Sequence, residues 1–485
     1  MAEQVRQKPK RAALLAEKIA KDIVVNQLPR GHSLGIEPDL LIKYQISRDS
    51  FREAIRILEW QGMVVTARGA RGGIQVANPN QDNVSNLLRE YIQLSSAPLQ
   101  DILDANRIIG VFSIELTIKQ LNHSTIATLN KLLKQLQQPL PDKLSQQAME
   151  SEVLKYSLFL FEVAKLAQNP IVAIFIKPLN DVLINSINFN QLSEEDLKQA
   201  TTLGRTAYSE YTQSIIDGDA KATISKLDFI LKNLKVLIEK SNHSDGIAHK
   251  HQDPTPFWVA DSQHKKAQTL LYKIKQYIDI NQLQPGKPIG REPELIKKYQ
   301  VSRSIFREAI RQLEIIGLVR QRKGRNGGLI VATPDPNGIS RAAVLFLGRT
   351  DLECKQLEQA RIVIEVHIAQ YAATAITAQQ AIALRQALET SQSLSGIDYI
   401  QAAVKIHSLI NQCSGNQVLS LFMDVLAEST IIKSEDKIPI KRVIENTEAI
   451  KNSLHHLITA ILARDPLAAA NHMRSHRALI AKVVK

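Results

Sequence analysis

The sequence predicts a mainly α-helical protein of several domains, with a small β-hairpin in two of them. The chain has 485 residues, more than a single hydrophobic core usually holds. Residues 26–79 recur at 281–334 with roughly 29 of 54 positions identical, which indicates a duplicated folded unit. After each copy, Leu, Ile and Ala recur at helical spacing with little Gly or Pro, which is typical of an all-α domain.

Each copy of the repeat begins with an amphipathic helix. Apolar residues at i, i+4 and i+8 lie on one face of a helix, so this face should be buried. These residues are Leu15, Ile19 and Ile23 in the first copy and Leu270, Ile274 and Ile278 in the second.

A short second helix and a longer third helix follow. Glu-Pro precedes an apolar stretch at residues 31–45 and again at 286–300, where Pro fits the first turn of a helix. The third helix should be N-capped by a serine and ended by a glycine. These residues are Ser47 and Gly62 in the first copy and Ser302 and Gly317 in the second.

A hairpin completes each copy. Two β-prone runs flank a Gly-rich basic turn in "MVVTARGARGGIQVA" (63–77) and in "LVRQRKGRNGGLIVA" (318–332). Three helices and a hairpin make a winged helix-turn-helix. This fold places the N-terminal end of its third helix in the major groove of DNA.

The order of domains is therefore head, bundle, linker, head, bundle. The polar stretch "SNHSDGIAHKHQDPTPF" (241–257) has no apolar periodicity and is typical of a linker. We expect winged helix-turn-helix domains at 1–80 and 263–335, all-α bundles at 81–240 and 336–485, and a linker at 241–262.

Composition favours a polyanionic partner. Lys and Arg number 61 against 48 acids, which gives a formal charge of +13. The basic N-terminus lacks the apolar core of a signal peptide, and no apolar run of roughly 18 residues is evident. We therefore expect a soluble, cytoplasmic protein without a membrane partner. Cys354 and Cys413 are too few for a disulfide framework and should be reduced thiols.

The series "LGxEPxLxxxYxxSRxxFREAxRxLExxG", followed by a basic "GxxGGxxV" wing, resembles the DNA-binding domain of the GntR family in its FadR-like branch. The motifs cover about 65 residues of each copy. Residues 203–227 and 448–473 resemble the last helices of the FCD-type ligand domain of that branch, each with a break, at Asp219 or Asp465. The resemblance implies a DNA-binding transcription regulator, with repression as the expected mode, controlled by a small metabolite.

The resemblance also implies which residues contact DNA. Arg at i and i+4 projects from one helix face, and guanidinium suits bidentate contact with guanine or phosphate. Wing residues are expected to reach toward the minor groove. The candidates are Ser47, Arg48, Asp49, Arg52, Arg56, Arg68, Gly69 and Arg71 in copy one, and Ser302, Arg303, Ser304, Arg307, Arg311, Lys323, Gly324 and Arg325 in copy two.

Two features qualify this assignment. The arginines could instead pair with acids of the same helix, namely Glu53 and Glu59 or Glu308 and Glu314. A carboxylate at Asp49 would repel phosphate unless it accepts a hydrogen bond from a cytosine amine, so copy one is expected to differ from copy two in base preference or affinity.

The bundles of many FadR-like proteins hold a divalent metal through one Asp and three His. When copy two is aligned on Asn416 and Asp465, the four metal-ligand positions are occupied by Ala403, His407, Leu454 and His476. In copy one, the same four positions are occupied by Tyr156, Leu160, Tyr208 and Ile230. We therefore expect no metal and no cofactor. An acyl thioester or a small carboxylate remains the expected effector, the latter held by Arg107 or Arg361. The candidate ligand-binding residues are Arg107, Arg361, His407 and His476.

Three functions were weighed. The first is a ligand-responsive transcription regulator whose two non-identical heads bind double-stranded DNA, as a monomeric pseudo-dimer or as a homodimer. The second is an architectural DNA-binding protein whose bundles only mediate association. The third, an enzyme, is disfavoured because no phosphate loop and no nucleophile motif is present in the sequence.

Overall fold

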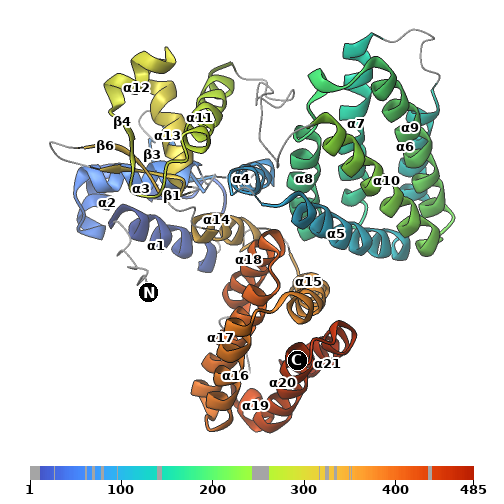
Figure 1. Cartoon of the computed structure of the whole chain (residues 1–485). Helices are drawn as coiled ribbons and strands as arrows, with labels where there is room; N and C mark the ends of the chain where they lie inside the picture. Colours follow the sequence, from blue (N-terminus) through green and yellow to red (C-terminus); the bar gives the residue numbers. More distant parts are fainter. Residues whose placement is uncertain are drawn as a thin grey trace.

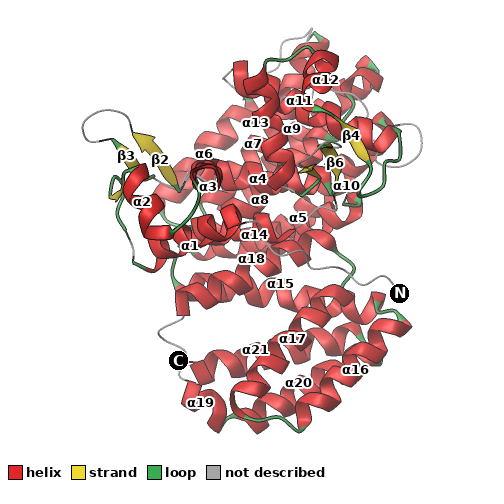
Figure 2. Cartoon of the chain, turned by 90° about the vertical axis from the view of Figure 1, so that its left-hand side faces the viewer, coloured by secondary structure: helices red, strands yellow, loops and turns green. Residues whose placement is uncertain are grey.

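The computed structural model describes residues 11–242 and 262–484, apart from 27, 61–62, 68–71, 78–80, 96, 139–144, 316, 323–326, 333–335, 349, 351 and 435–439. Helices make up most of this part, and its strands belong to two small sheets (Figure 2). The predicted linker lies almost entirely outside the described residues. Cys354 and Cys413 are free thiols.

Residues 11–76 form a small domain with a core of its own, here called head 1. Helix α1 packs on α3, where Ala54 is completely buried. The predicted core face of the first helix is confirmed, because Leu15, Ile19 and Ile23 are all buried. The elements are α1 (Arg11–Val25), β1 (Ser33–Gly35), α2 (Glu37–Tyr44), α3 (Arg48–Trp60), β2 (Val64–Ala67) and β3 (Gly73–Val76).

Residues 262–331, here called head 2, contain the same order of elements. Ala309 is completely buried where α11 packs on α13. The core of head 2 is continuous with that of the rest of the protein, whereas the core of head 1 is separate. The elements are α11 (Ser262–Ile280), β4 (Pro288–Gly290), α12 (Glu292–Tyr299), α13 (Arg303–Ile315), β5 (Val319–Arg322) and β6 (Gly328–Val331).

Each head contains a three-stranded sheet where the sequence predicted only a hairpin. The strand orders are β1-β3-β2 and β4-β6-β5, all antiparallel. The additional strand passes very close to the hairpin: a Cβ added to Gly73 would lie 2.7 Å from the carbonyl oxygen of Gly35. Gly73 also has a φ of +128°, so this crossing requires glycine. Gly328 approaches Gly290 in the same way.

Two all-helical bundles follow the heads. The predicted break before each last helix is confirmed, because Asp219 and Asp465 cap α10 and α21 by accepting from Ala222 N and Ala468 N, both at 2.9 Å. Bundle 1 (residues 97–242) contains α5 (Leu99–Lys119), α6 (His123–Gln137), α7 (Gln146–Lys165), α8 (Pro170–Asn185), η1 (Phe189–Gln191), α9 (Glu194–Ile216) and α10 (Ala220–Ser241). Bundle 2 (residues 352–484) contains α15 (Cys354–Ala375), α16 (Ala378–Gln392), α17 (Gly396–Cys413), α18 (Gln417–Ser434), α19 (Ile440–Glu445), α20 (Thr447–Leu462) and α21 (Pro466–Val484).

Two connecting helices, α4 (Gln81–Leu94) and α14 (Pro336–Gly348), each lead from a head into the bundle that follows it in the chain (Figure 1). They pack on each other, α4 also packs on α8, and α14 also packs on α18. Head 1, however, packs its α1 on α14, where a Cβ on Gly348 would lie 2.7 Å from Val24. In head 2, the Tyr272 hydroxyl of α11 donates to Gln93 of α4. Each head therefore contacts the helix that leads into the other bundle.

The two bundles meet through corresponding residues. Asn169 and Asn416 cap α8 and α18 by accepting from Ile171 N and Val418 N. Six residues after each cap, Phe175 and Phe422 stack with ring centroids 3.9 Å apart. Both asparagines also donate across the interface to the third residue of the opposite bundle's first helix, Asn169 to Gln356 O at 3.3 Å and Asn416 to Asp101 O at 3.2 Å. The contact is therefore reciprocal, as in a two-fold interface.

One segment corrects an expectation from the sequence. Residues Pro170–Gln191, which include α8, are long and apolar enough to cross a membrane by length and composition. Of this window, 78% is buried inside the protein, as for the central helix of a bundle.

Candidate DNA interface and effector site

The third helix of each head begins with a serine cap, as predicted. Ser47 Oγ accepts from Ser50 N at 3.4 Å, and Ser302 Oγ accepts from Ile305 N at 3.3 Å. Asp49 and Ser304 are exposed beside these caps. The predicted base-contacting arginines remain open to solvent, with exposed side-chain fractions of 65% for Arg48 and 53% for Arg52. Arg303 and Arg307 have 70% and 51%.

These arginines pair with an acid that sequence reasoning missed. Glu37 Oε1 accepts from Arg48 Nε at 2.9 Å and from Arg52 Nε at 3.0 Å. In head 2, Glu292 Oε1 accepts from Arg303 Nε at 2.8 Å and from Arg307 Nε at 3.3 Å. For these four arginines, the alternative of partners on the same helix is therefore replaced by a partner on the second helix. The Glu-Pro present in both copies was the available signal.

Two of the acids considered as alternative partners of the arginines, Glu59 and Glu314, instead bind the backbone of the wings. Glu59 accepts from the backbone N–H of Thr66 in β2, and Glu314 accepts from Gln321 N in β5 at 2.9 Å. These carboxylates fix the first strand of each wing to the end of the recognition helix. The wing residues themselves, Arg68, Gly69, Arg71, Lys323, Gly324 and Arg325, lie outside the described residues.

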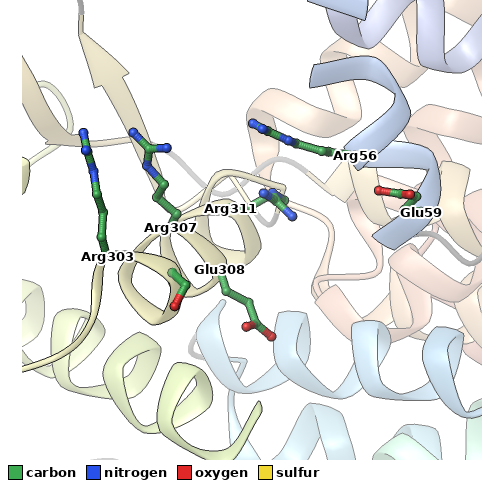
Figure 3. Close-up of a pocket in the computed structure, with 7 residues that line it drawn as sticks. Arg56, Glu59, Arg303, Arg307, Glu308 and Arg311 are labelled. Carbon is green, nitrogen blue, oxygen red and sulfur yellow. The ribbon is translucent and has the colours of Figure 1, made fainter. Parts of the chain in front are cut away.

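A cleft of about 620 Å³ lies between the two recognition helices. Figure 3 shows Arg303 and Arg307 on one side and Arg56 on the other. Burial lowers the pKa of Arg311, and the nearby Arg56 lowers it further. Neither Arg56 nor Arg311 forms an ion pair with another residue in the described part of the chain. Both heads contribute arginines to this space, and the four arginines of its lining outnumber the two glutamates, Glu59 and Glu308, which suits a polyanion.

Bundle 2 has a charged cluster in its core. Arg477 contacts Glu358 at 2.5 Å and Glu365 at 2.9 Å, and Arg361 contacts Glu365 at 3.0 Å. Burial alone would raise the pKa of Glu365, but Arg477 and Arg361 hold it at about 2. The cluster is thus an ionised network within a mostly apolar core.

The structure brings His407 and His476 together beside this network. Their Nε2 atoms are 3.1 Å apart, and Ser453 Oγ lies 2.7 Å from His476 Nδ1. Burial lowers the pKa of His407 to about 4 and that of His476 to about 3. Both imidazoles are therefore neutral at neutral pH.

These residues do not fit a divalent metal. The nearest carboxylate, Glu365, is paired with two guanidinium groups, and those groups would repel a cation. Across the described residues, no three His, Cys, Asp or Glu side chains gather so that they could hold a metal ion. His455, His456 and His472 form only ring contacts, at 5.6 Å or more between centroids.

Bundle 1 has apolar groups at the corresponding positions. Aligned on the caps Asn169 and Asn416, His407 corresponds to Leu160. Aligned on the caps Asp219 and Asp465, His476 corresponds to Ile230 and Arg477 to Leu231. Aligned on Asp101 and Gln356, which accept the asparagine hydrogen bonds across the interface, Glu365 corresponds to Gly110. Nearby, Tyr156 and Tyr208 stack with centroids 4.8 Å apart, and Tyr156 donates to Thr201 O at 2.8 Å.

Arg107 lies apart from both cores. It forms a bidentate pair with Asp228 at 2.6 and 3.0 Å, and its side chain is 46% exposed. Of the predicted ligand-binding residues, the structure thus groups Arg361, His407 and His476 and leaves Arg107 out.

Comparison with known proteins matches the C-terminal half of the chain to two domain families. The profile of the bacterial regulatory proteins of the gntR family matches residues 266–328, and that of the FCD domain matches 356–479. The repressor NanR of Cronobacter sakazakii is 25% identical over 219 residues, which are 44% of this chain and 84% of NanR. The uncharacterised regulator YcbG of Bacillus subtilis is 26% identical over 210 residues, 43% of this chain and 86% of YcbG.

Solved structures of the same kind are also similar. A Streptococcus agalactiae GntR protein is 19% identical with a TM-score of 0.33, and the match covers 44% of this chain and 99% of that one. E. coli McbR/YncC is 16% identical with a TM-score of 0.23 over 48% and 100% of the two chains. The curated relatives are regulators and not enzymes. The C-terminal half of this chain therefore matches a GntR-type helix-turn-helix domain and an FCD domain, and these matches support a DNA-binding transcription regulator.

Proposed function

We propose that this regulator arose by tandem duplication and acts as a pseudo-dimer within one chain. The observation that carries this proposal is the reciprocal contact between the bundles, in which Phe175 stacks on Phe422 and corresponding asparagines donate across the interface. A two-fold interface between identical subunits joins a residue to its own counterpart. Here one chain supplies both counterparts. The proposed copies have the domain boundaries that the sequence repeat predicts.

On DNA, the two heads would read the halves of an imperfect palindrome. Arg48 and Arg52 would contact bases in one half, and Arg303 and Arg307 in the other. The wing residues, with Arg56 and Arg311, would hold the DNA backbone. Because the helix starts differ at Asp49 and Ser304, the halves should differ in sequence. Such a regulator would work in the cytoplasm, where bacterial DNA is.

Bundle 2 is the proposed effector site and bundle 1 the scaffold. Half-buried Arg361 and buried Arg477 in bundle 2 offer two neighbouring cations, and Arg361 Nε has no hydrogen-bond partner among the described atoms. A small carboxylate could accept from these groups by displacing Glu365. Because these two groups are cations that suit a carboxylate, we favour a carboxylate over an acyl thioester. The contact of α14 with α18 and α1 would carry the effect to head 1.

Binding-site selection from fragmented genomic DNA tests the proposal on the heads. The wild-type chain is compared with Arg52→Ala and Arg307→Ala. We expect one bipartite motif, with each variant losing a different half. If the wild-type chain enriches no motif, the architectural alternative is correct instead.

Thermal unfolding tests the effector site. A panel of mono- and dicarboxylates and one acyl-coenzyme A thioester is added to the wild-type chain, to Arg361→Met and to Arg107→Met. A carboxylate should raise the Tm of the wild type and of Arg107→Met but not of Arg361→Met. A rise given only by the thioester, or one that survives Arg361→Met, would exclude this assignment.

A further inference from the structure

A single carboxylate from the second helix lies between two arginines of the recognition helix in each head. Glu37 accepts from Nε of Arg48 and from both Nε and Nη2 of Arg52, and Glu292 accepts from Nε of Arg303 and Nε of Arg307. The arrangement recurs in two domains whose surroundings differ. It is therefore a property of the head and not of one local packing.

The carboxylate is held more firmly than the arginines. The side chain of Glu37 is 27% exposed, compared with 65% and 53% for its two partners. It starts helix α2, and the following Pro38 fixes the backbone of that first turn. Burial would raise the pKa of Glu37, but the hydrogen bonds from Arg52 and Arg48 outweigh it and lower the pKa. Glu37 is therefore a charged, fixed point to which two long side chains are attached.

In Arg48, the contact with Glu37 uses the Nε–H group and leaves the terminal Nη groups available. Arg48 donates to Glu37 through Nε only, and its terminal Nη groups make no hydrogen bond with a residue in the described part of the chain. Two such N–H donors are what a bidentate contact with guanine requires. The same acid cancels part of the charge with which these arginines attract any phosphate.

We propose that Glu37 and Glu292 are positioning residues that set the base specificity of the two heads. They orient the arginines toward base edges and weaken contacts with the backbone of unrelated DNA. This inference rests on the proposed function of Arg48, Arg52, Arg303 and Arg307 as base-contacting residues. An Arg pair without its acid would bind DNA well and choose among sequences poorly.

Glu37→Gln in the full chain tests this proposal, because Gln keeps the size of the side chain and removes its charge. The matched control is Glu53→Gln, which removes one exposed carboxylate from α3 itself without touching either arginine. Binding to the selected site and to a scrambled duplex is measured by fluorescence anisotropy over a range of KCl concentrations, and site selection is repeated for each variant.

For Glu37→Gln we expect tighter binding to the scrambled duplex and a roughly tenfold smaller ratio of specific to nonspecific affinity, the size of one lost base contact. The selected motif should broaden only in the half read by head 1. Glu53→Gln should change both affinities together and leave the ratio unchanged. Glu292→Gln should broaden the other half, which keeps the test decisive if head 1 tolerates substitution poorly.

An unchanged ratio and an unchanged motif in both Glu37→Gln and Glu292→Gln would overturn the inference while the regulator function stands. Absence of a motif for the wild-type chain would instead overturn both the inference and the proposed function.

Discussion

The two heads of this protein are alike where they would meet DNA, whereas the two bundles differ where a ligand would bind. In the heads, one acid and two arginines recur with the same contacts. In the bundles, the positions of His407, His476, Arg477 and Glu365 correspond to Leu160, Ile230, Leu231 and Gly110. The two heads thus keep the same polar contacts, whereas at these four bundle positions only bundle 2 has ionisable side chains.

The largest effect is expected from Arg477→Met. This change leaves Glu365 buried with its partnership halved, and breaking a buried pair costs about 3–5 kcal/mol. Faster hydrogen exchange in peptides from α15 and α21 should show this loss of stability. The triple variant that adds Glu365→Met and Arg361→Met leaves no unpaired charge of this network in the core and should recover most of the stability. Equal exchange in both variants would contradict this account of the cluster.

A smaller loss is expected in bundle 1 from Gly204→Ala. The added Cβ would lie 2.3 Å from Cε2 of Tyr156, whose ring is fixed against Tyr208. Overpacking of this kind costs about 1–3 kcal/mol. Exchange in α9 should rise, whereas the response to a carboxylate should not change if bundle 1 is only a scaffold. Adding Tyr156→Leu should restore the space and the stability.

The contact between the bundles should respond symmetrically. Phe175→Leu and Phe422→Leu each remove one ring from the same stacked pair, which is worth about 0.5–1.5 kcal/mol beyond burial. We expect both variants to lower the Tm by similar amounts. Strongly unequal shifts would show that the two residues do not correspond.

Acid should destabilise bundle 2 before bundle 1. The pKa values of His407 and His476 fall from 6.5 to about 4 and about 3 on folding, so the unfolded chain binds more protons in this range. The stabilisation is complete above pH 6.5 and is lost as the pH falls toward 4. Asp424, whose pKa burial raises to about 6, acts in the opposite direction with a single group. In the double variant His407→Gln with His476→Gln, the hydrogen-exchange protection of α21 should depend less on pH between 6.5 and 4.5 than it does in the wild type.

The sequence predicted most of the heads because their signals are local. The i, i+4 pattern of Leu15, Ile19 and Ile23 and the cap at Ser47 depend on neighbours along the chain. The short strand β1 was missed because three residues show no periodicity. Glu37 was missed as the partner of Arg48 because it lies 11 residues away, on another helix.

The bundles show the same limit at longer range. The family resemblance placed His407 and His476 at one site, and the structure brings them together. The ion pair of Arg477 with Glu358 joins residues 119 positions apart, so no local pattern could have indicated it. The crossed contacts of the heads depend equally on tertiary packing.

The mass of the complex with the selected DNA site tests the central claim most directly. Light scattering during size-exclusion chromatography gives the number of 54.2 kDa chains on one duplex. The account predicts one chain on a site with both half-sites, and one chain still after either half-site is scrambled, with weaker binding. Two chains on the intact site and one on each isolated half-site would show that the heads act between chains, and would contradict the single-chain pseudo-dimer.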